Sequence, residues 1–83
     1  MTLDQVYTQL TPIFRDVFDD EELVPVPVMT AKDVSEWDSL NHIRLIVAVE
    51  KSFQIKFATA EVSSFRDVGH FADTILAKHS LAA

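Results

Sequence analysis

The chain has 83 residues, of which 48% are apolar and 24% charged; it has no cysteine and a formal net charge of −6. This composition excludes disordered and collagen-like chains, and the length predicts a single domain over residues 1–83. Without cysteine there is no disulfide, thiolate nucleophile or zinc–thiolate site. Because the chain also lacks a long apolar run and a secretory signal, we expect a cytoplasmic protein with no membrane span.

The negative charge is concentrated in the first half of the chain. Residues 1–41 hold nine acidic and two basic side chains, whereas residues 42–83 hold four acidic and five basic ones. Nucleic acid needs clustered Lys and Arg, so it is not expected as a partner, and basic protein surfaces fit better. We expect the protein to be a monomer.

Helices should dominate, because the single glycine cannot supply the turns of an all-β fold. Apolar residues at helical spacing predict a first helix over about residues 3–18. Pro12 lies inside this segment and removes one backbone hydrogen bond, so we expect a kink there or a helix that restarts at Thr11–Pro12.

Residues 19–38 read as a long loop. The acidic run at 19–22 lacks the spaced ligands and the glycine of a calcium loop, and is expected to be a solvated face. Val24, Val26 and Val28 alternate with prolines that hold the chain extended, and we expect these valines to pack on the core. Residues 30–33 could form a capped helical turn.

Three further helical segments follow. Residues 39–53 contain no proline or glycine and form the strongest predicted helix. Thr59 is a candidate cap for a single turn through Ser63, and Asp67 for a last helix whose apolar face is Val68, Phe71, Ala72, Ile75 and Leu76. The fold class is therefore all-α: a small four-helix bundle of three main helices and one short helix, with a long loop between the first and second.

The helix over 39–53 carries two apolar stripes on a helical wheel. Leu45, Ile46, Val49 and Phe53 form the core stripe. Leu40, Ile43 and Val47 form a second stripe, which so small a bundle can cover only partly. We expect this stripe, bordered by Arg44, Glu50 and Lys51, to bind a partner protein.

Ser39 stands where the long loop meets this helix. A serine there is typical of an N-cap, but a helix start also favours a phosphate attached to the hydroxyl, and periodicity does not decide between them. Catalysis by Ser39 and His42 is not expected, because the chain has no Gly-x-Ser-x-Gly elbow. His42 is expected to be partly buried and hydrogen-bonded, and the three histidines do not have the spacing of a metal site.

The segment Trp37-Asp38-Ser39-Leu40-Asn41-His42-Ile43, with Glu50 and Phe53 downstream, resembles the acyl carrier protein family over about the whole chain. The resemblance implies a carrier that is not an enzyme. It implies that Ser39 is esterified by 4′-phosphopantetheine, delivered from coenzyme A by a magnesium-dependent phosphopantetheinyl transferase. Acyl groups would be attached as thioesters to the thiol of this arm. Asp38 would help the transferase to recognise the site.

By the same resemblance, Leu40, Ile43 and Val47 would contact partner enzymes of acyl-transferring, ligase or ketosynthase type, and Glu50 would add an ionic contact. Many members have a richly acidic helix here, whereas this one carries Arg44 and Lys51 on the partner side. We therefore expect a discrete carrier of a dedicated pathway of polyketide or modified fatty-acid type. A peptidyl or aminoacyl carrier, and an unmodified helical interaction module in which Ser39 only caps, are the alternatives.

Two roles stay open at this point. Trp37 could contact the cargo or anchor the loop on the helices. The apolar side chains of the second half could line a pocket for an acyl chain, although they are first of all the core. These side chains are Phe57, Val62, Phe65, Val68, Phe71 and Ile75.

Overall fold

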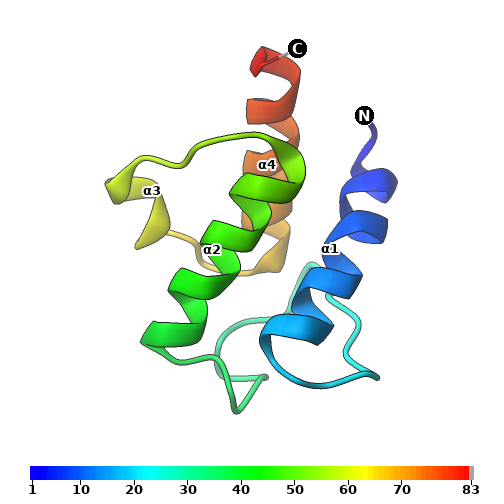
Figure 1. Ribbon diagram of the computed structural model, residues 1–83, viewed down its shortest axis with the longest axis vertical. Helices are drawn as coiled ribbons and strands as arrows, with labels where there is room; N and C mark the ends of the chain where they lie inside the picture. Colours follow the sequence, from blue (N-terminus) through cyan, green and yellow to red (C-terminus); the bar gives the residue numbers. More distant parts are fainter. Residues whose placement is uncertain (83) are drawn as a thin grey trace.

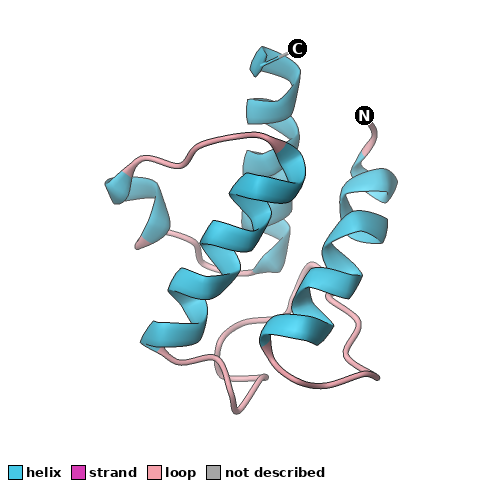
Figure 2. Ribbon diagram, in the orientation of Figure 1, coloured by secondary structure: helices cyan, strands magenta, loops and turns pink. Residues whose placement is uncertain are grey.

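The computed structural model describes the backbone of residues 1–82 and the side chains of residues 1–80. All regular secondary structure in this part is helical: α1 (Leu3–Val17), α2 (Ser39–Phe53), α3 (Thr59–Val62) and α4 (Val68–Ala82). Figures 1 and 2 show the three long helices side by side and α3 on the side of α2 that is away from α1. The predicted all-α bundle with three main helices, one short helix and a long first loop is confirmed.

The core lies between α1, α2 and α4. Each long helix contributes residues three or four positions apart, which is the spacing that places side chains on one helical face. α1 packs against both α2 and α4. The predicted core stripe of α2 is confirmed, and so is the predicted face of α4, where Leu76 is half-buried. The buried helical residues are Val6, Leu10, Phe14, Leu45, Ile46, Val49, Phe53, Val68, Phe71, Ala72 and Ile75.

The first helix is continuous through Pro12. The prediction of a restart at Thr11–Pro12 is wrong, because one helix runs from Leu3 to Val17 with the proline inside it. Pro12 is exposed, so water can serve the carbonyl that loses its intrahelical donor. The helix ends one residue before the predicted end, where Asp19 takes a left-handed conformation with φ 51° and the amide of Asp20 bonds the carbonyl of Arg15 at 3.1 Å.

The prediction that the loop valines pack on the core is wrong. Val24, Val26 and Val28 are 52%, 41% and 82% exposed, and the residue that is buried is Pro25. In an extended segment neighbouring side chains face opposite sides, so a shift of one residue turns the whole set outward. The register is set where the amide of Gly69, at the start of α4, donates to the carbonyl of Pro27 at 2.9 Å.

Gly69 allows this close approach of the loop. A Cβ atom at this position would lie 3.1 Å from the carbonyl oxygen of Pro27 and 3.2 Å from its Cβ. The adjacent amide of Val68 donates to the carbonyl of Met29 at 2.9 Å. The first turn of α4 thus uses free amide groups to hold the loop against the start of this helix.

The loop also contains the turn expected at residues 30–33. The amide of Thr30 donates to Oδ2 of Asp33 at 2.9 Å, and the amide of Asp33 donates back to the carbonyl of Thr30 at 3.0 Å. This is a hydrogen-bonded turn rather than a helix. It is followed by Val34, which is buried and joins the loop to the core.

The caps of the last two helices differ from each other. Thr59 does not cap α3 as predicted: it is the first helical residue, Ala58 precedes it, and the turn ends at Val62 instead of Ser63. Ala58 has no side-chain acceptor, and its amide instead donates to Oε1 of Glu61 at 2.7 Å. The predicted cap of α4 is confirmed, because Oδ1 of Asp67 accepts from the amide of His70 at 2.8 Å.

Candidate functional site at the start of α2

Ser39 is the first residue of α2 and is exposed, but it does not cap the helix. The cap is Asp38, which has extended backbone angles (φ −106°, ψ −175°) and accepts from the amide of Asn41 through Oδ1 at 2.8 Å. The hydroxyl of Ser39 has no hydrogen-bond partner among the described residues. The capping role is thus filled by the neighbouring residue, and the serine oxygen is free to react.

Trp37 fixes the loop that leads into α2. Its ring packs edge-on against Phe14 at 5.7 Å between centroids and lies 5.2 Å from Phe18, so it is held by α1 and its C-cap. Its Nε1 donates to Nδ1 of His42 at 3.1 Å. The loop-anchor interpretation of Trp37 is therefore correct, and the anchor fixes the position of Ser39 relative to the core.

His42 is half-buried and hydrogen-bonded through both ring nitrogens, as expected. Because Trp37 can only donate, Nδ1 of His42 is an acceptor and the ring proton lies on Nε2. Nε2 lies 2.7 Å from the carbonyl oxygen of Val62 and donates to it. Both nitrogens are occupied, so this histidine cannot take a proton from the Ser39 hydroxyl as a general base.

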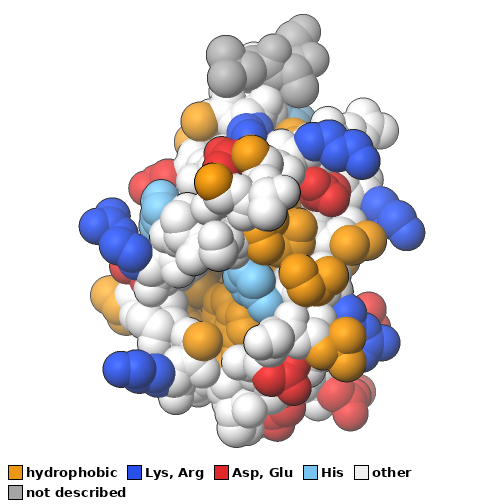
Figure 3. Space-filling view, turned by 90° about the vertical axis from the view of Figure 1, so that its left-hand side faces the viewer, with side chains coloured by type: hydrophobic (Ala, Val, Ile, Leu, Met, Phe, Trp, Pro, Cys, Tyr) orange, Lys and Arg blue, Asp and Glu red, His pale blue; other side chains and the backbone are white. Residues whose placement is uncertain are grey.

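An open groove of about 850 Å³ lies beside Ser39. It is bounded by the end of the long loop, by α2 and by the segment from Val62 to Phe71. In Figure 3, which faces this side, hydrophobic side chains and a histidine line a hollow near the centre of the surface. The residues that line the groove are Thr30, Ala31, Lys32, Trp37, Asp38, Ser39, His42, Ile43, Val62, Ser63, Phe65, Arg66, Asp67 and Phe71.

The groove is lined by two acidic and two basic side chains. Asp38 and Asp67 each accept a backbone N–H as helix caps, whereas Lys32 and Arg66 are exposed and form no ion pair within the described part of the chain. The start of α2 adds the positive end of a helix dipole. A phosphodiester on the Ser39 oxygen would carry a negative charge into this surrounding. The side chains present therefore fit a phosphate-linked group at Ser39.

Sequence reasoning missed Lys32 and Arg66. Neither residue belongs to a motif, and the end of the long loop, all of α2 and all of α3 lie between them in the chain. Only the packing of the loop against the start of α4 brings them to the same groove. No periodic pattern in the sequence signals this.

The second apolar stripe of α2 is on the surface as predicted. Leu40, Ile43 and Val47 are 67%, 52% and 42% exposed, so the alternative of a fully buried helix is wrong. Arg44 and Lys51 are exposed beside the stripe and form no ion pair in the part of the chain that the structure describes. We call these five residues the α2 strip. Its binding role remains a prediction.

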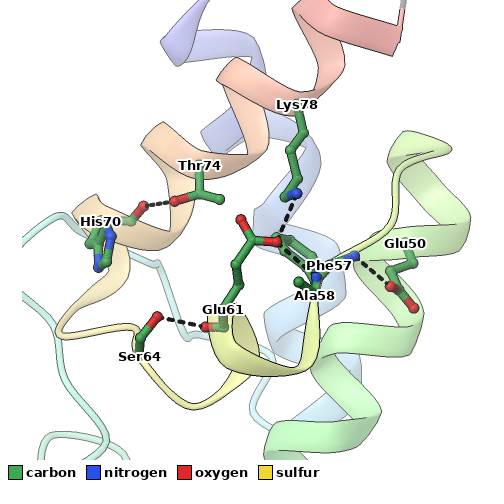
Figure 4. A network of polar contacts seen from close by, with 8 residues as sticks. All are labelled: Glu50, Phe57, Ala58, Glu61, Ser64, His70, Thr74 and Lys78. Atoms are coloured by element: carbon green, nitrogen blue, oxygen red, sulfur yellow. Dashed lines mark hydrogen bonds and ion pairs between the residues drawn. The ribbon is translucent and has the colours of Figure 1, made fainter.

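Glu50, which was expected beside this strip, is half-buried and already engaged. Its Oε2 accepts from the amide of Phe57 at 2.9 Å, and this bond fastens the connection between α2 and α3 (Figure 4). One carboxylate oxygen is therefore used inside the fold. The ionic contact with a partner stays a prediction.

α3 is held to α4 by a polar contact that the sequence did not reveal. Nζ of Lys78 lies 2.8 Å from Oε1 of Glu61, and the same ammonium lies 5.7 Å from the ring centroid of Phe57 (Figure 4). The hydrogen bond from Lys78, with that from the amide of Ala58, lowers the pKa of Glu61 below its ordinary value of 4.5. These contacts position the far wall of the groove.

A small helical bundle with an anchored loop and a free serine at the start of its second helix has the features expected of a carrier domain. No protein-family model and no curated protein match the chain. It is similar to the solution NMR structure of a holo acyl carrier protein from Geobacter metallireducens, with 43% sequence identity and a TM-score of 0.84. The match covers 98% of this chain and 88% of the other. The chain belongs to the acyl carrier protein family.

Members of this family are carriers without catalytic activity, and their cofactor is a covalent 4′-phosphopantetheine. Both inferences drawn from the sequence resemblance are confirmed by this membership. No helix that the structure describes is long and apolar enough to cross a membrane. Within the same residues, no three metal-ligating side chains gather into a cluster.

Proposed function

We propose that Ser39 carries the phosphopantetheine arm, and that the chain holds acyl intermediates on it for enzymes of fatty-acid or polyketide type biosynthesis. This assignment rests on the observation that Asp38, and not Ser39, caps α2. Asp38 caps the helix, which leaves the exposed hydroxyl of Ser39 without a structural task. The alternative of an unmodified interaction module assumed that Ser39 caps the helix, but the cap is Asp38.

The attachment reaction requires only this hydroxyl from the chain. Oγ of Ser39 attacks the phosphorus of coenzyme A that bears the pantetheine, and a new P–O bond forms. The P–O bond to adenosine 3′,5′-bisphosphate breaks, and the proton of the hydroxyl passes to a base of the transferase. The arm supplies a thiol, which holds acyl groups as thioesters in a protein without cysteine.

Asp38 serves two purposes in this proposal. Its Oδ1 accepts from the amide of Asn41, while its other oxygen has no hydrogen-bond partner within the described residues and is available to the transferase. Lys32 and Arg66 lie around the same groove and would balance the charge of the attached phosphodiester. The transferase would thus meet a rigid helix start with one carboxylate and one hydroxyl exposed.

The α2 strip is the proposed surface for acyl-transferring, ligase or ketosynthase-type enzymes. Apolar burial at Leu40, Ile43 and Val47 would supply affinity, and Arg44 and Lys51 would orient a partner whose socket is rimmed by carboxylates. Enzymes that select acidic helices would be repelled by these two cations. This supports a dedicated pathway. The monomeric state, the cytoplasmic location and the single-domain organisation stay predictions.

Intact-mass measurement tests the attachment site. Unmodified protein is incubated with coenzyme A, Mg²⁺ and a phosphopantetheinyl transferase. We expect one added phosphopantetheinyl group in the wild type, one in Ser63→Ala, which alters another exposed serine of the groove, and none in Ser39→Ala. Wild-type protein that stays at its bare mass, or Ser39→Ala that gains the group, would overturn the assignment.

A competition assay tests the proposed pathway type. The loaded chain is offered to a housekeeping ketosynthase or malonyl transferase beside that enzyme's own carrier. We expect poor use of the wild type and better use of each single variant, Arg44→Glu and Lys51→Glu, with Lys56→Glu as a charge-matched control outside α2. The dedicated-pathway proposal fails if the wild type is used as well as the enzyme's own carrier.

A further inference from the structure

Among the described residues, one side-chain hydrogen bond joins α2 to α3. α3 is a single turn with no buried residue, so apolar packing fixes it weakly. Nε2 of His42 donates to the carbonyl of Val62, the last residue of α3, at 2.7 Å. The histidine is in turn held by Nε1 of Trp37, whose ring packs on Phe14. A continuous chain of contacts therefore runs from the core of α1 to α3.

This chain of contacts lies between the groove and the core. His42 and Val62 both line the groove, and so does Phe71, which is only 2% exposed and belongs to the core. The view in Figure 3 places a histidine within the central hollow. A group that passed from the groove between α2 and α3 would have to separate His42 from Val62.

Separation would leave two polar groups without partners. The N–H of His42 and the carbonyl of Val62 would then lie against the inserted alkyl chain instead of each other, and polar groups left without partners are costly. Trp37 is also affected, because its hydrogen bond requires the same histidine orientation. This cost is fixed, whereas the gain from burying an acyl chain grows with each methylene. The contact therefore opposes short chains more effectively than long ones.

We infer that His42 is a positioning residue that latches α3 to α2 and keeps short tethered acyl groups in the surface groove, outside the core. The inference rests on the proposed attachment at Ser39. The groove offers Ile43 and Phe65 as apolar walls and Lys32 and Arg66 as free cations. It suits short acyl groups that carry polar substituents better than long alkyl chains.

The chain supplies a reporter for each location. Trp37 is the single tryptophan and lines the groove, whereas Val49 and Ile75 are fully buried with 0% exposure. The arm is loaded with a butyryl or an octanoyl group, and tryptophan emission and methyl NMR shifts are compared with the unacylated arm. In the wild type we expect butyryl to change the Trp37 emission and to leave the Val49 and Ile75 methyl signals in place.

Three variants separate the latch from a merely structural role. His42→Leu keeps bulk but removes both hydrogen bonds, and we expect butyryl and octanoyl then to shift both core methyl signals and to raise Tm above that of the unacylated variant. His42→Gln retains an amide donor for the carbonyl of Val62 and should restore the wild-type pattern. His79→Leu changes a half-buried histidine outside the groove and should behave as wild type.

The results distinguish a latch at His42 from free entry of short acyl groups into the core. Wild-type protein whose Val49 and Ile75 methyl signals move when butyryl is attached would overturn the latch. If His42→Leu does not fold, the butyryl response of the wild type decides alone. Added mass is checked before either measurement, so failure of the arm to attach is recognised as failure of the proposed function.

Discussion

The three-helix core and α3 are held in place by different forces. Apolar side chains such as Phe14, Leu45 and Ile75 join α1, α2 and α4 and are fully buried. α3 has no fully buried residue: Val62 packs on the core but is only partly buried, and polar contacts from His42 and Lys78 add to the attachment. Buried apolar surface is lost only when the domain unfolds, whereas a single net hydrogen bond contributes about 1 kcal/mol. α3 can therefore open locally while the rest stays folded.

The candidate site lies on the boundary between these two regions. Ser39 belongs to α2, and the loop before it is anchored by Trp37 against the core. The opposite wall of the groove begins at Val62 in α3. A fixed attachment point next to a weakly held wall lets a carrier keep its arm in place while the surroundings of the cargo adapt.

The largest change in the free energy of unfolding should come from a substitution in the core. Phe14→Ala removes a fully buried ring from the contact between α1 and Trp37, and we expect the free energy of unfolding to fall by about 3–5 kcal/mol. Urea denaturation followed by far-UV circular dichroism measures this. Val28→Ala, in the exposed loop, should stay within about 0.5 kcal/mol of the wild type. A cost below about 1 kcal/mol for Phe14→Ala would contradict the conclusion that apolar packing holds the three long helices together.

Local patterns were sufficient to predict the helical part of the core from the sequence. The helical period identified the buried stripe of α2 and its exposed counterpart, because both depend only on the angle between successive residues. The motif around Ser39 identified the family. The capping residue was missed because serine and aspartate are both good caps, and a shift of one residue in the helix start exchanges their roles.

Contacts between distant segments were not predictable. The loop valines were placed inward, but the contact between Pro27 and Gly69, 42 positions apart in the chain, sets the register that turns them outward. The bond between His42 and Val62 and the ion pair between Glu61 and Lys78 join residues with no shared pattern. The sequence thus indicates where the arm is attached, whereas the walls of the groove depend on tertiary packing.

Substitutions of the two residues at the start of α2 should differ in their effect on the free energy of unfolding, and this difference is of intermediate size. Asp38→Ala removes the side chain that accepts from Asn41, and the loss of such a cap typically costs about 1 kcal/mol. Ser39→Ala removes a hydroxyl with no partner in the described structure and should change the free energy of unfolding by less than about 0.5 kcal/mol. Urea denaturation of both unmodified variants tests the pair. Equal costs, or a larger cost for Ser39→Ala, would contradict the assignment of the cap.

The smallest expected effect is a loss of local stability in α3 when Glu61 is protonated at low pH. The hydrogen bond from Lys78 is the main cause of the lowered pKa of Glu61, and the amide of Ala58 adds to it. Because the folded state has the lower pKa, the contribution of this carboxylate is complete above about pH 4.5 and is lost as pH falls through the folded value.

Hydrogen exchange, corrected for the intrinsic rate at each pH, measures this local loss. Protection of the amides of Val62 and Ser64, which bond within and just after α3, should fall below pH 4.5 while amides of α1 stay protected. Lys78→Met keeps the apolar stem but removes the charge, so it should flatten this dependence, whereas Lys56→Met should not. Parallel loss of protection in α1 would show that α3 and the core unfold together, and the two regions would then be one cooperative unit.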